Sequence, residues 1–341
     1  MGAPDPDIGI LDVTVVLLDG GFSSTAIMPI EVFHSAGALW RQLHGEAPEP
    51  RFRVTIATVD GQAVTSAYGL SLIPQASIDR IDKTDIIIVS TSALDLDGTL
   101  AANDALHPWL CRQHAQGAYV AGVCMAAAYL GQAGLLDGRM ATTHWALAAD
   151  FARRFPKAIW RPEMMVTEDG RVLCSGGVSA SIDVSLYLVE KLCGHEVAVQ
   201  CAKSLLINMP RVSQSGYAVL PLSAEHSDAP IRAVQAWLHE HCREDLSIDR
   251  LAGRAGMTAR TFVRRFKAAT GRFPGAYVQA ARVELAKAML ERDAAPIQTV
   301  SSAVGYDNVA FFRALFKRAT GMTPAQYRAT FAATGAGQPA A

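Results

Sequence analysis

The sequence predicts an α/β fold, a doubly wound and mostly parallel sheet, followed by an all-α domain. Three features of the 341-residue chain predict this class. Apolar runs of strand length alternate with helical segments through the first two thirds of the chain. These runs are rich in β-branched residues, as strands of a parallel sheet covered on both faces require. The last hundred residues repeat one helical unit instead.

The expected strands and helices alternate along residues 10–207, which we expect to form one domain. The strands are expected at 13–18, 52–59, 85–90, 118–123 and 171–176, and the helices at 27–40, 103–116, 125–133, 145–155 and 178–192. In a doubly wound sheet the ligand lies beyond the carboxyl ends of the strands. We therefore expect a ligand pocket at that edge.

A possible nucleophile lies where the expected strand 118–123 runs into an Ala-rich helix. Cys124 occupies this junction, with the small residues Gly122 and Ala126 two positions to either side. Small neighbours permit the tight turn of a nucleophile elbow, and a helix N-terminus favours the thiolate form of cysteine. The alternative is that Cys124 is simply a small buried core residue.

Three blocks around this elbow resemble a known fold. They are SSTAIMPIEVFHSAG (23–37), VAGVCMAAAYLGQAGLLDGRMATTHW (120–145) and SGGVSASIDVSLYLVEKL (175–192). They resemble the class I glutamine amidotransferase-like, flavodoxin-like fold of the ThiJ/PfpI superfamily, in the version fused to AraC domains. Within such a fold we expect the ligand pocket at Glu31, Ser90, Thr91, Ser92, Cys124, Met125 and His144.

The chain departs from the enzymes of this superfamily at several positions. Related enzymes pair the cysteine with a histidine and an acid, or with an acid from the first loop. Here Thr25-Ala26 stands where related hydratases carry Leu-Asp, and Met125 where His or Thr is usual. Residues 90–93 (STSA) replace a Pro-Gly-Gly loop. We therefore expect a metabolite sensor without catalytic residues; the alternative is a hydrolase or hydratase that uses Cys124.

A change in composition separates this domain from the rest of the chain. Residues 208–230 lose periodicity and gain Pro, Ser and Gly, which is typical of a linker. We expect the all-α domain at 231–331 and a disordered tail at 332–341.

A repeated unit defines the all-α domain. FKAATGRFPGAY (266–277) and FKRATGMTPAQY (316–327) are identical at seven of twelve positions, fifty residues apart. Each copy follows a short apolar helix and a turn with glycine, Gly256 or Gly305, which is the helix-turn-helix layout. Thr258, and Asp307 or Asn308, are candidate N-caps. An ordinary amphipathic hairpin is the alternative, and the second copy makes it less favourable.

Charge distribution points to nucleic acid. Residues 229–330 contain 16 basic and 8 acidic side chains, a net charge of +8, while the rest of the chain has 15 basic and 24 acidic, a net charge of −9. Thirteen of the 16 basic residues are arginines, which suit bidentate contacts with guanine and phosphate. A basic module on an acidic body is typical of a nucleic-acid-binding protein.

The segment GYDNVAFFRALFKRATGMTPAQYR (305–328) closely resembles the signature of AraC/XylS-type DNA-binding domains. The resemblance implies two helix-turn-helix units joined by a long helix at 275–292, with both recognition helices in successive major grooves, about 34 Å apart. The DNA-contacting positions carried over are Arg260, Thr261, Val263, Arg264, Lys267, Asn308, Val309, Ala310, Arg313 and Lys317. Val263, Val309 and Ala310 donate no hydrogen bonds, so they either contact thymine methyl groups or discriminate little between bases.

The partners and location expected for the chain follow from these points. We expect a cytoplasmic homodimer that binds double-stranded DNA, RNA polymerase and a small effector, and that is an activator rather than a repressor by resemblance. Related regulators respond to amino-acid-like or amine metabolites. Six scattered cysteines without a CxxC pair predict no zinc site or disulfides, and we expect no cofactor. No charge-free apolar run reaches the roughly 18 residues of a membrane span.

Overall fold

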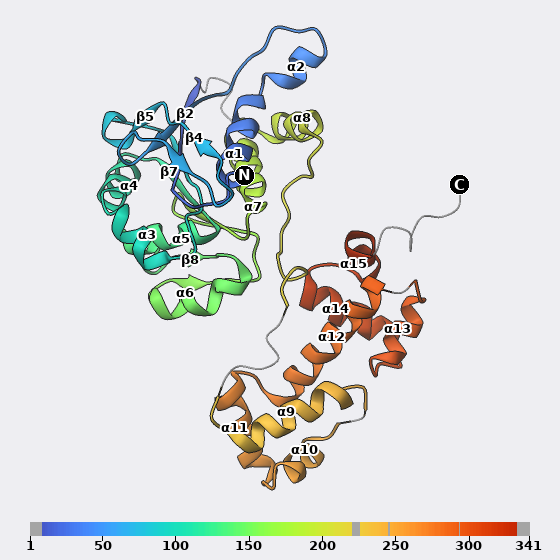
Figure 1. Ribbon diagram of the computed structural model, residues 1–341. Helices are drawn as coiled ribbons and strands as arrows, with labels where there is room; N and C mark the ends of the chain where they lie inside the picture. Colours follow the sequence, from blue (N-terminus) through green and yellow to red (C-terminus); the bar gives the residue numbers. More distant parts are fainter. Residues whose placement is uncertain (1–8, 220–225, 245, 293, 333–341) are drawn as a thin grey trace. The chain divides into compact units, whose positions relative to one another are not determined.

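A computed structural model describes residues 9–219, 226–244, 246–292 and 294–332. The chain divides into two compact units, with the boundary between Gln214 and Ser215 (Figure 1). The expected tail lies, apart from Ala332, outside the described residues. No helix of the described ranges is long and apolar enough to cross a membrane.

The first unit contains a seven-stranded sheet in the order β10-β11-β7-β6-β1-β2-β5. Within the described strands of this sheet, β10 and β11 form the antiparallel pair and the other neighbours are parallel. The strands are β1 (Leu11–Val16), β2 (Phe52–Thr58), β5 (Ala76–Ser77), β6 (Ile86–Val89), β7 (Tyr119–Val123), β10 (Val166–Asp169) and β11 (Val172–Ser175). The mostly parallel α/β sheet expected from the sequence is confirmed, and the five expected strands correspond to β1, β2, β6, β7 and β11.

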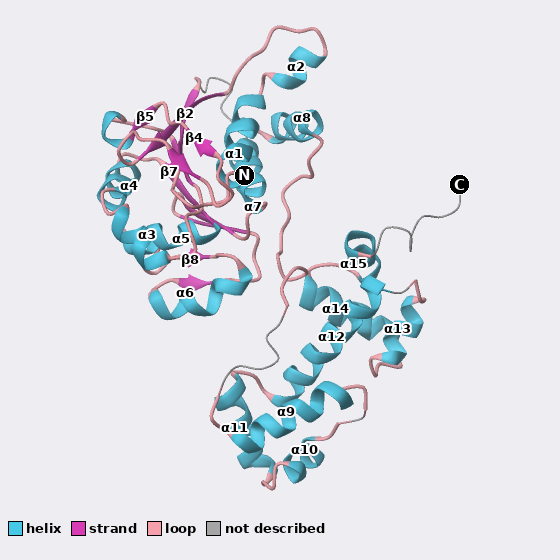
Figure 2. Ribbon diagram, viewed as in Figure 1, coloured by secondary structure: helices cyan, strands magenta, loops and turns pink. Residues whose placement is uncertain are grey.

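Helices cover both faces of this sheet (Figure 2). One layer contains α1, α7 and α8, and the other contains α4 and α5. The helices of the unit are α1 (Ser24–Ser35), α2 (Leu39–Leu43), α3 (Leu96–Ala102), α4 (Leu106–Ala115), α5 (Ala127–Gln132), α6 (Ala148–Arg154), α7 (Ala180–Cys193) and α8 (His195–Leu205), with 3₁₀ turns η1 (Ile78–Arg80), η2 (Cys124–Ala126) and η3 (Trp145–Leu147). Two short strand pairs complete it, β3 (Val64–Thr65) with β4 (Ser71–Leu72), and β8 (Met140–Ala141) with β9 (Ile159–Trp160).

The register of the central strands brings three loops to one edge of the sheet. Val16 of β1 pairs with Val89 of β6, and Val89 pairs with Gly122 of β7. Because these strands are parallel, the loops that follow them, beginning at Leu17, Ser90 and Cys124, leave the sheet at the same edge. The strand interior is fully apolar there, since Ile86, Ile87, Ile88 and Val89 are each 0% exposed.

The second unit is all-α, with two hydrophobic cores. Its helices are α9 (Ala229–His241), α10 (Ile248–Arg254), α11 (Ala259–Thr270), α12 (Pro274–Arg292), α13 (Ile297–Ala303), α14 (Val309–Thr320) and α15 (Pro324–Phe331). Helix α12 is shared: Tyr277 belongs to the core around α9–α11, and Val283 and Leu290 belong to the core around α13–α15. The two expected helical units and the long helix between them are therefore present.

Residues 211–218 of the segment expected to be a linker form side-chain contacts with the unit to which each belongs. The Arg211 guanidinium forms an ion pair with buried Asp183 at 2.5 Å, and the amide of buried Gln214 donates to the Thr143 carbonyl at 2.8 Å. In the second unit, the Lys287 ammonium donates to the Ala218 carbonyl at 2.7 Å. The chain on either side of the Gln214–Ser215 bond is thus held by side-chain hydrogen bonds.

Candidate DNA-binding surface and candidate ligand pocket

Matching caps fix the start and end of the two candidate recognition helices. The Thr258 hydroxyl accepts the Thr261 N–H at 3.4 Å at the start of α11, and the Asn308 side-chain oxygen accepts the Phe311 N–H at 3.0 Å at the start of α14. Both helices end on a left-handed glycine, Gly271 with φ 72° or Gly321 with φ 77°. The predicted caps Thr258 and Asn308 are confirmed, and each cap satisfies an otherwise free N–H.

Helix α11 buries a phenylalanine pair and exposes arginines. Phe262 and Phe266 are 0% exposed, whereas Arg260 and Arg264 are exposed and have no ion pair or hydrogen bond within the described residues. The Lys267 ammonium lies 4.3 Å from the centre of the exposed Phe273 ring. The remaining two candidates on this helix, Thr261 and Val263, are half-buried.

Arg265, the neighbour of Arg264 on the same helix, forms an ion pair within the protein. Its guanidinium donates to both carboxylate oxygens of Asp228, at 2.9 and 2.8 Å. Asp228 also caps α9 by accepting the Ile231 N–H, and the Arg265 guanidinium holds the pKa of this carboxyl below its usual value. Arg265 thus attaches α11 to the start of α9, whereas Arg260 and Arg264 have no ion pair within the described residues.

Helix α14 has the same buried pair and a different exposed surface. Phe312 and Phe316 are 0% exposed, and Arg313 and Lys317 are exposed. Among the other expected DNA-contacting residues, Asn308 and Ala310 are exposed and Val309 is half-buried. Phe311 belongs to the AraC-type signature but was not among the expected DNA-contacting residues, and its side chain is 48% exposed next to them.

The junction between β7 and α5 has the strained geometry of an elbow. Cys124 has φ 57°, a left-handed conformation that costs energy for a residue with a side chain. A Cβ at Gly122 would lie 3.0 Å from backbone atoms of Ala126, so the turn requires a small residue there. The Thr143 hydroxyl donates to the Cys124 carbonyl at 2.9 Å and holds the turn from outside.

The thiol at this elbow favours its protonated form. Cys124 is 6% exposed, and burial raises its pKa despite opposing hydrogen bonds from the backbone of Met125 and His144 and the side chain of Thr91. The expectation that the helix N-terminus favours thiolate is therefore wrong for this thiol. Desolvation is the largest influence on this pKa, because burial removes the water that would stabilise a thiolate.

The other expected pocket residues fall into two groups. Ser90, Thr91, Ser92 and Met125 are buried at the carboxyl edge of the sheet, and the Thr91 N–H donates to the Thr25 hydroxyl at 3.1 Å. Glu31 instead is exposed on α1. A cavity of about 10 Å³ lies at this edge, lined mainly by residues of the loops after β1 and β6 and of the β3–β4 turn: Leu17, Leu18, Gly21, Phe22, Ser23, Ala26, Ser66, Leu72, Ser90 and Thr91. Its volume suits a single water molecule.

His144 is positioned as a cap. Its Nδ1 accepts the Ala146 N–H at 3.1 Å, at the start of η3. Burial lowers the pKa of this imidazole, so the neutral form is favoured. With Nδ1 engaged by the backbone, the ring proton lies on Nε2, and this arrangement differs from a histidine that is oriented by an acid for base catalysis.

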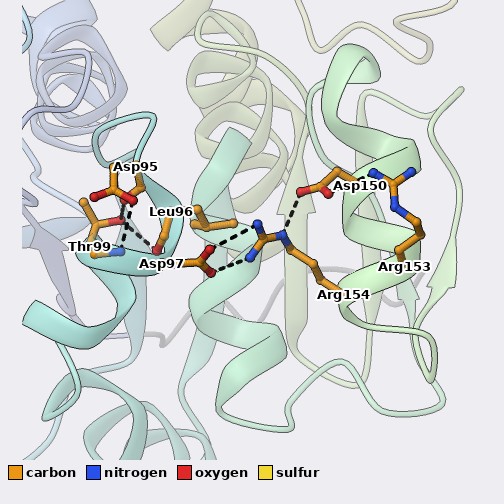
Figure 3. A network of polar contacts seen from close by, with 8 residues as sticks. Asp95, Leu96, Asp97, Thr99, Asp150, Arg153 and Arg154 are labelled. Atoms are coloured by element: carbon orange, nitrogen blue, oxygen red, sulfur yellow. Dashed lines mark hydrogen bonds and ion pairs between the residues drawn. The ribbon is translucent and has the colours of Figure 1, made fainter.

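An ion-pair network on the surface joins helix α3 to helix α6 (Figure 3). Arg154 of α6 contacts Asp97 of α3 at 2.5 Å and Asp150 of its own helix at 2.8 Å. The Asp97 side chain is 76% exposed, so solvent screening leaves this network a small contribution to stability. It connects α3, which follows Ser92, to α6, which follows His144.

Comparisons with known proteins identify both units. Residues 12–191 match the model of the DJ-1/PfpI family, and residues 251–330 match that of a helix-turn-helix domain. The chain belongs to the DJ-1/PfpI family. DJ-1beta of Drosophila melanogaster has the same fold, with a TM-score of 0.50 and 21% identity over 59% of this chain and 100% of that protein.

One curated relative is similar over most of this chain, and another over less than half of it. The HTH-type transcriptional regulator CdhR of Pseudomonas aeruginosa is 26% identical over 296 residues, 85% of this chain and 87% of that protein. The isonitrile hydratase of Pseudomonas putida is 34% identical over 150 residues, 44% of this chain and 63% of the hydratase. Together with the family matches, this makes the chain an AraC-type transcriptional regulator with an N-terminal DJ-1/PfpI domain, as its motifs predicted.

Proposed function

We propose that this regulator places α11 and α14 in successive major grooves of double-stranded DNA and that a small metabolite bound to its DJ-1/PfpI domain controls the binding. The observation that supports this best is the shared design of the two helices. Each buries a phenylalanine pair and exposes cations that have no ion pair among the described residues, Arg260 and Arg264 on α11 and Arg313 on α14. An exposed cationic helix behind a short turn is the docking geometry of helix-turn-helix proteins.

Different residues have different roles in this proposal. Arg260, Arg264 and Arg313 contact base edges, because an exposed guanidinium reaches guanine O6 and N7 with two hydrogen bonds. Lys267 and Lys317 neutralise phosphates and contribute no sequence preference. Thr261 and Val263 are half-buried and lie beside these contacts, and Asn308 offers its amide N–H groups, since its oxygen caps the helix.

The effector site in this proposal is the loop cluster at the carboxyl edge of the sheet, near Ser90, Thr91, Ser92, Cys124 and His144. A cavity of about 10 Å³ is too small for an amino-acid-like or amine metabolite. We propose that the loops after β1 and β6 separate from the β3–β4 turn when the effector enters this cavity. That rearrangement gives the effector two protein states between which to discriminate, which ligand control requires. We also propose that the protein is a homodimer and that it activates transcription through contact with RNA polymerase.

Selection from a random duplex library by the full-length chain tests DNA binding. We expect one enriched sequence, with two footprints about 34 Å apart on one face of the duplex. Failure to enrich any sequence contradicts it. A thermal-shift screen against amino acids and amines tests effector binding, because a ligand that binds only the folded protein raises the melting temperature. A melting temperature unchanged by every compound argues against this effector class.

The strained Cys124 backbone favours one competing function, a cysteine-dependent hydratase or hydrolase. Its raised pKa opposes that function, since a nucleophilic cysteine acts as thiolate. Incubation with an alkyl isonitrile decides between them. The regulator proposal expects no turnover and a Cys124→Ser variant that alters effector response at most. Turnover that disappears in Cys124→Ser supports the enzyme.

A further inference from the structure

The two recognition helices differ most at the centre of their exposed faces. The repeat aligns residue 260 with 310 and residue 264 with 314. Both central positions are arginine in α11 and alanine in α14, and all four residues are exposed. Positions four residues apart lie on the same helix face, so α11 presents two guanidiniums where α14 presents two methyl groups.

Phe311 extends this apolar surface at the N-terminal end of α14. Its side chain is 48% exposed, its ring centre lies 5.6 Å from that of Tyr306, and the aligned residue in α11 is Thr261. The side chain of Asn308 lies next to this surface, and its oxygen is already engaged, because it accepts the Phe311 N–H. At its outer edge the surface is flanked by Arg313.

A helix with this surface suits one feature of the major groove. The methyl group of thymine is the only apolar group that a base pair presents there, and alanine and phenylalanine side chains contact it. Small residues at 310 and 314 let the helix approach the base edges closely, and Phe311 supplies the contact area. A recognition helix without these contacts gains little from an exposed phenylalanine.

We propose that α14 recognises thymine methyl groups through Ala310, Phe311 and Ala314, while α11 recognises guanine through Arg260 and Arg264. This inference rests on the proposed DNA-binding function and specifies the DNA. The site is asymmetric: α11 lies over guanines, whereas α14 lies over thymines next to the guanine that Arg313 contacts, displaced by a single helical turn. Of the two alternatives left open for Ala310, the proposal adopts the contact with thymine methyl groups.

Replacement of thymine by uracil in the selected DNA tests this inference. Deoxyuridine pairs as thymidine does and lacks only the methyl group, so each position of the enriched sequence is replaced in turn and affinity is measured by fluorescence anisotropy. We expect about a fourfold loss at one or more thymines beneath α14, the effect of losing one buried methyl-sized group. Thymines beneath α11 serve as the internal control and tolerate uracil.

A Phe311→Ala variant assigns the contact to the residue. This variant is expected to bind the thymine duplex more weakly and to lose its sensitivity to uracil at one position. Phe311→Leu should retain most of that sensitivity. The melting temperature of each variant verifies folding, which an exposed side chain affects little. Tolerance of uracil at every position overturns the inference, as does full uracil sensitivity in Phe311→Ala. Failure of the library to yield any site overturns the proposed function as well, so the two failures are distinguishable.

Discussion

The two helix-turn-helix units have nearly the same interior and different surfaces. The rings of Phe266 and Tyr277 meet at 5.2 Å and 84°, and those of Phe316 and Tyr327 at 5.4 Å and 83°. Outside, Arg260 of α11 is replaced by Ala310 of α14. Close packing constrains the buried positions, because a lost methylene group leaves a cavity. The exposed positions carry no such constraint and can serve different DNA sequences.

The units also differ in how the recognition helix is attached. In the first helix-turn-helix unit the bidentate Arg265–Asp228 ion pair joins α11 to α9. The residue aligned with Arg265 is Leu315, which is 4% exposed in the core of the second helix-turn-helix unit. One unit therefore uses a charged contact where the other uses apolar burial, and the two should respond differently to pH.

The largest expected effect comes from the shared interior. Phe262→Ala and Phe312→Ala each remove a fully buried ring and should cost about 3–5 kcal/mol of unfolding free energy in their own unit. Hydrogen exchange of the full chain measures this. In Phe262→Ala, protection should fall in α10–α11 more than in α13–α14, and the reverse holds for Phe312→Ala.

Phe311→Ala is the matched control, since that ring is half exposed and its removal should leave protection unchanged. Equal loss of protection in both units, from either core variant, would mean that the long helix α12 makes them unfold as one.

The surface difference predicts the next effect. Arg264→Ala should weaken binding of the selected DNA by about 1–3 kcal/mol and relax the preference beneath α11, if the guanidinium contacts guanine. Lys317→Ala should weaken binding to all sequences alike and reduce the salt dependence by about one phosphate contact. Anisotropy titrations at several salt concentrations separate the two. A variant of Arg264 with normal affinity and unchanged preference is incompatible with a base contact there.

These differences also show what the sequence determines by itself. The five long strands, the elbow at Cys124, the two caps and helix α12 depend on local patterns, namely β-branched runs, small flanking residues, short polar side chains and amphipathic spacing. They were predictable for that reason. The short strands β3, β4, β8 and β9 have two residues each, and no pattern of such length is distinctive.

Features that depend on distant partners were not predictable. Nothing local distinguishes Arg265 from Arg264, and only the fold brings Asp228 to one of them. The Cys124 pKa is raised because the surrounding core removes water, whereas the sequence indicated only the helix end. Glu31 lies on the exposed side of α1, and the phase of a helix against its sheet depends on packing.

The N-caps give a smaller effect. Thr258→Ala and Asn308→Ala should each cost about 0.5–2 kcal/mol, because each leaves an N–H at a helix start without its acceptor. The loss should be greater for Asn308, whose bond to the Phe311 N–H is 3.0 Å against 3.4 Å for Thr258. Chemical denaturation measures both. Substitution by Ser at either position is the control and should retain most of the stability, and a larger loss in Thr258→Ala would contradict the ranking by bond length.

The smallest effect is the loss of stability at low pH, and it distinguishes the two helix-turn-helix units most sharply. The pKa of Asp228 is lowered, mainly by Arg265, so the folded state favours the ionised carboxyl, and the added stability is present above the usual pKa near 3.8. It is lost as pH falls through the lowered folded-state value. The pair is partly exposed, with side chains 38% and 19% accessible, so its contribution should be about 0.2–1 kcal/mol.

Asp228→Asn isolates this charge, because asparagine caps a helix as well as aspartate does. The variant should lose the stability difference at neutral pH and match the parent chain at acid pH. Hydrogen exchange should place the change in α9 and α11 and not in α14, where Leu315 offers no titrating group. An equal acid response of α14 in the parent chain would mean that other carboxylates, and not this ion pair, govern the stability of the DNA-binding unit.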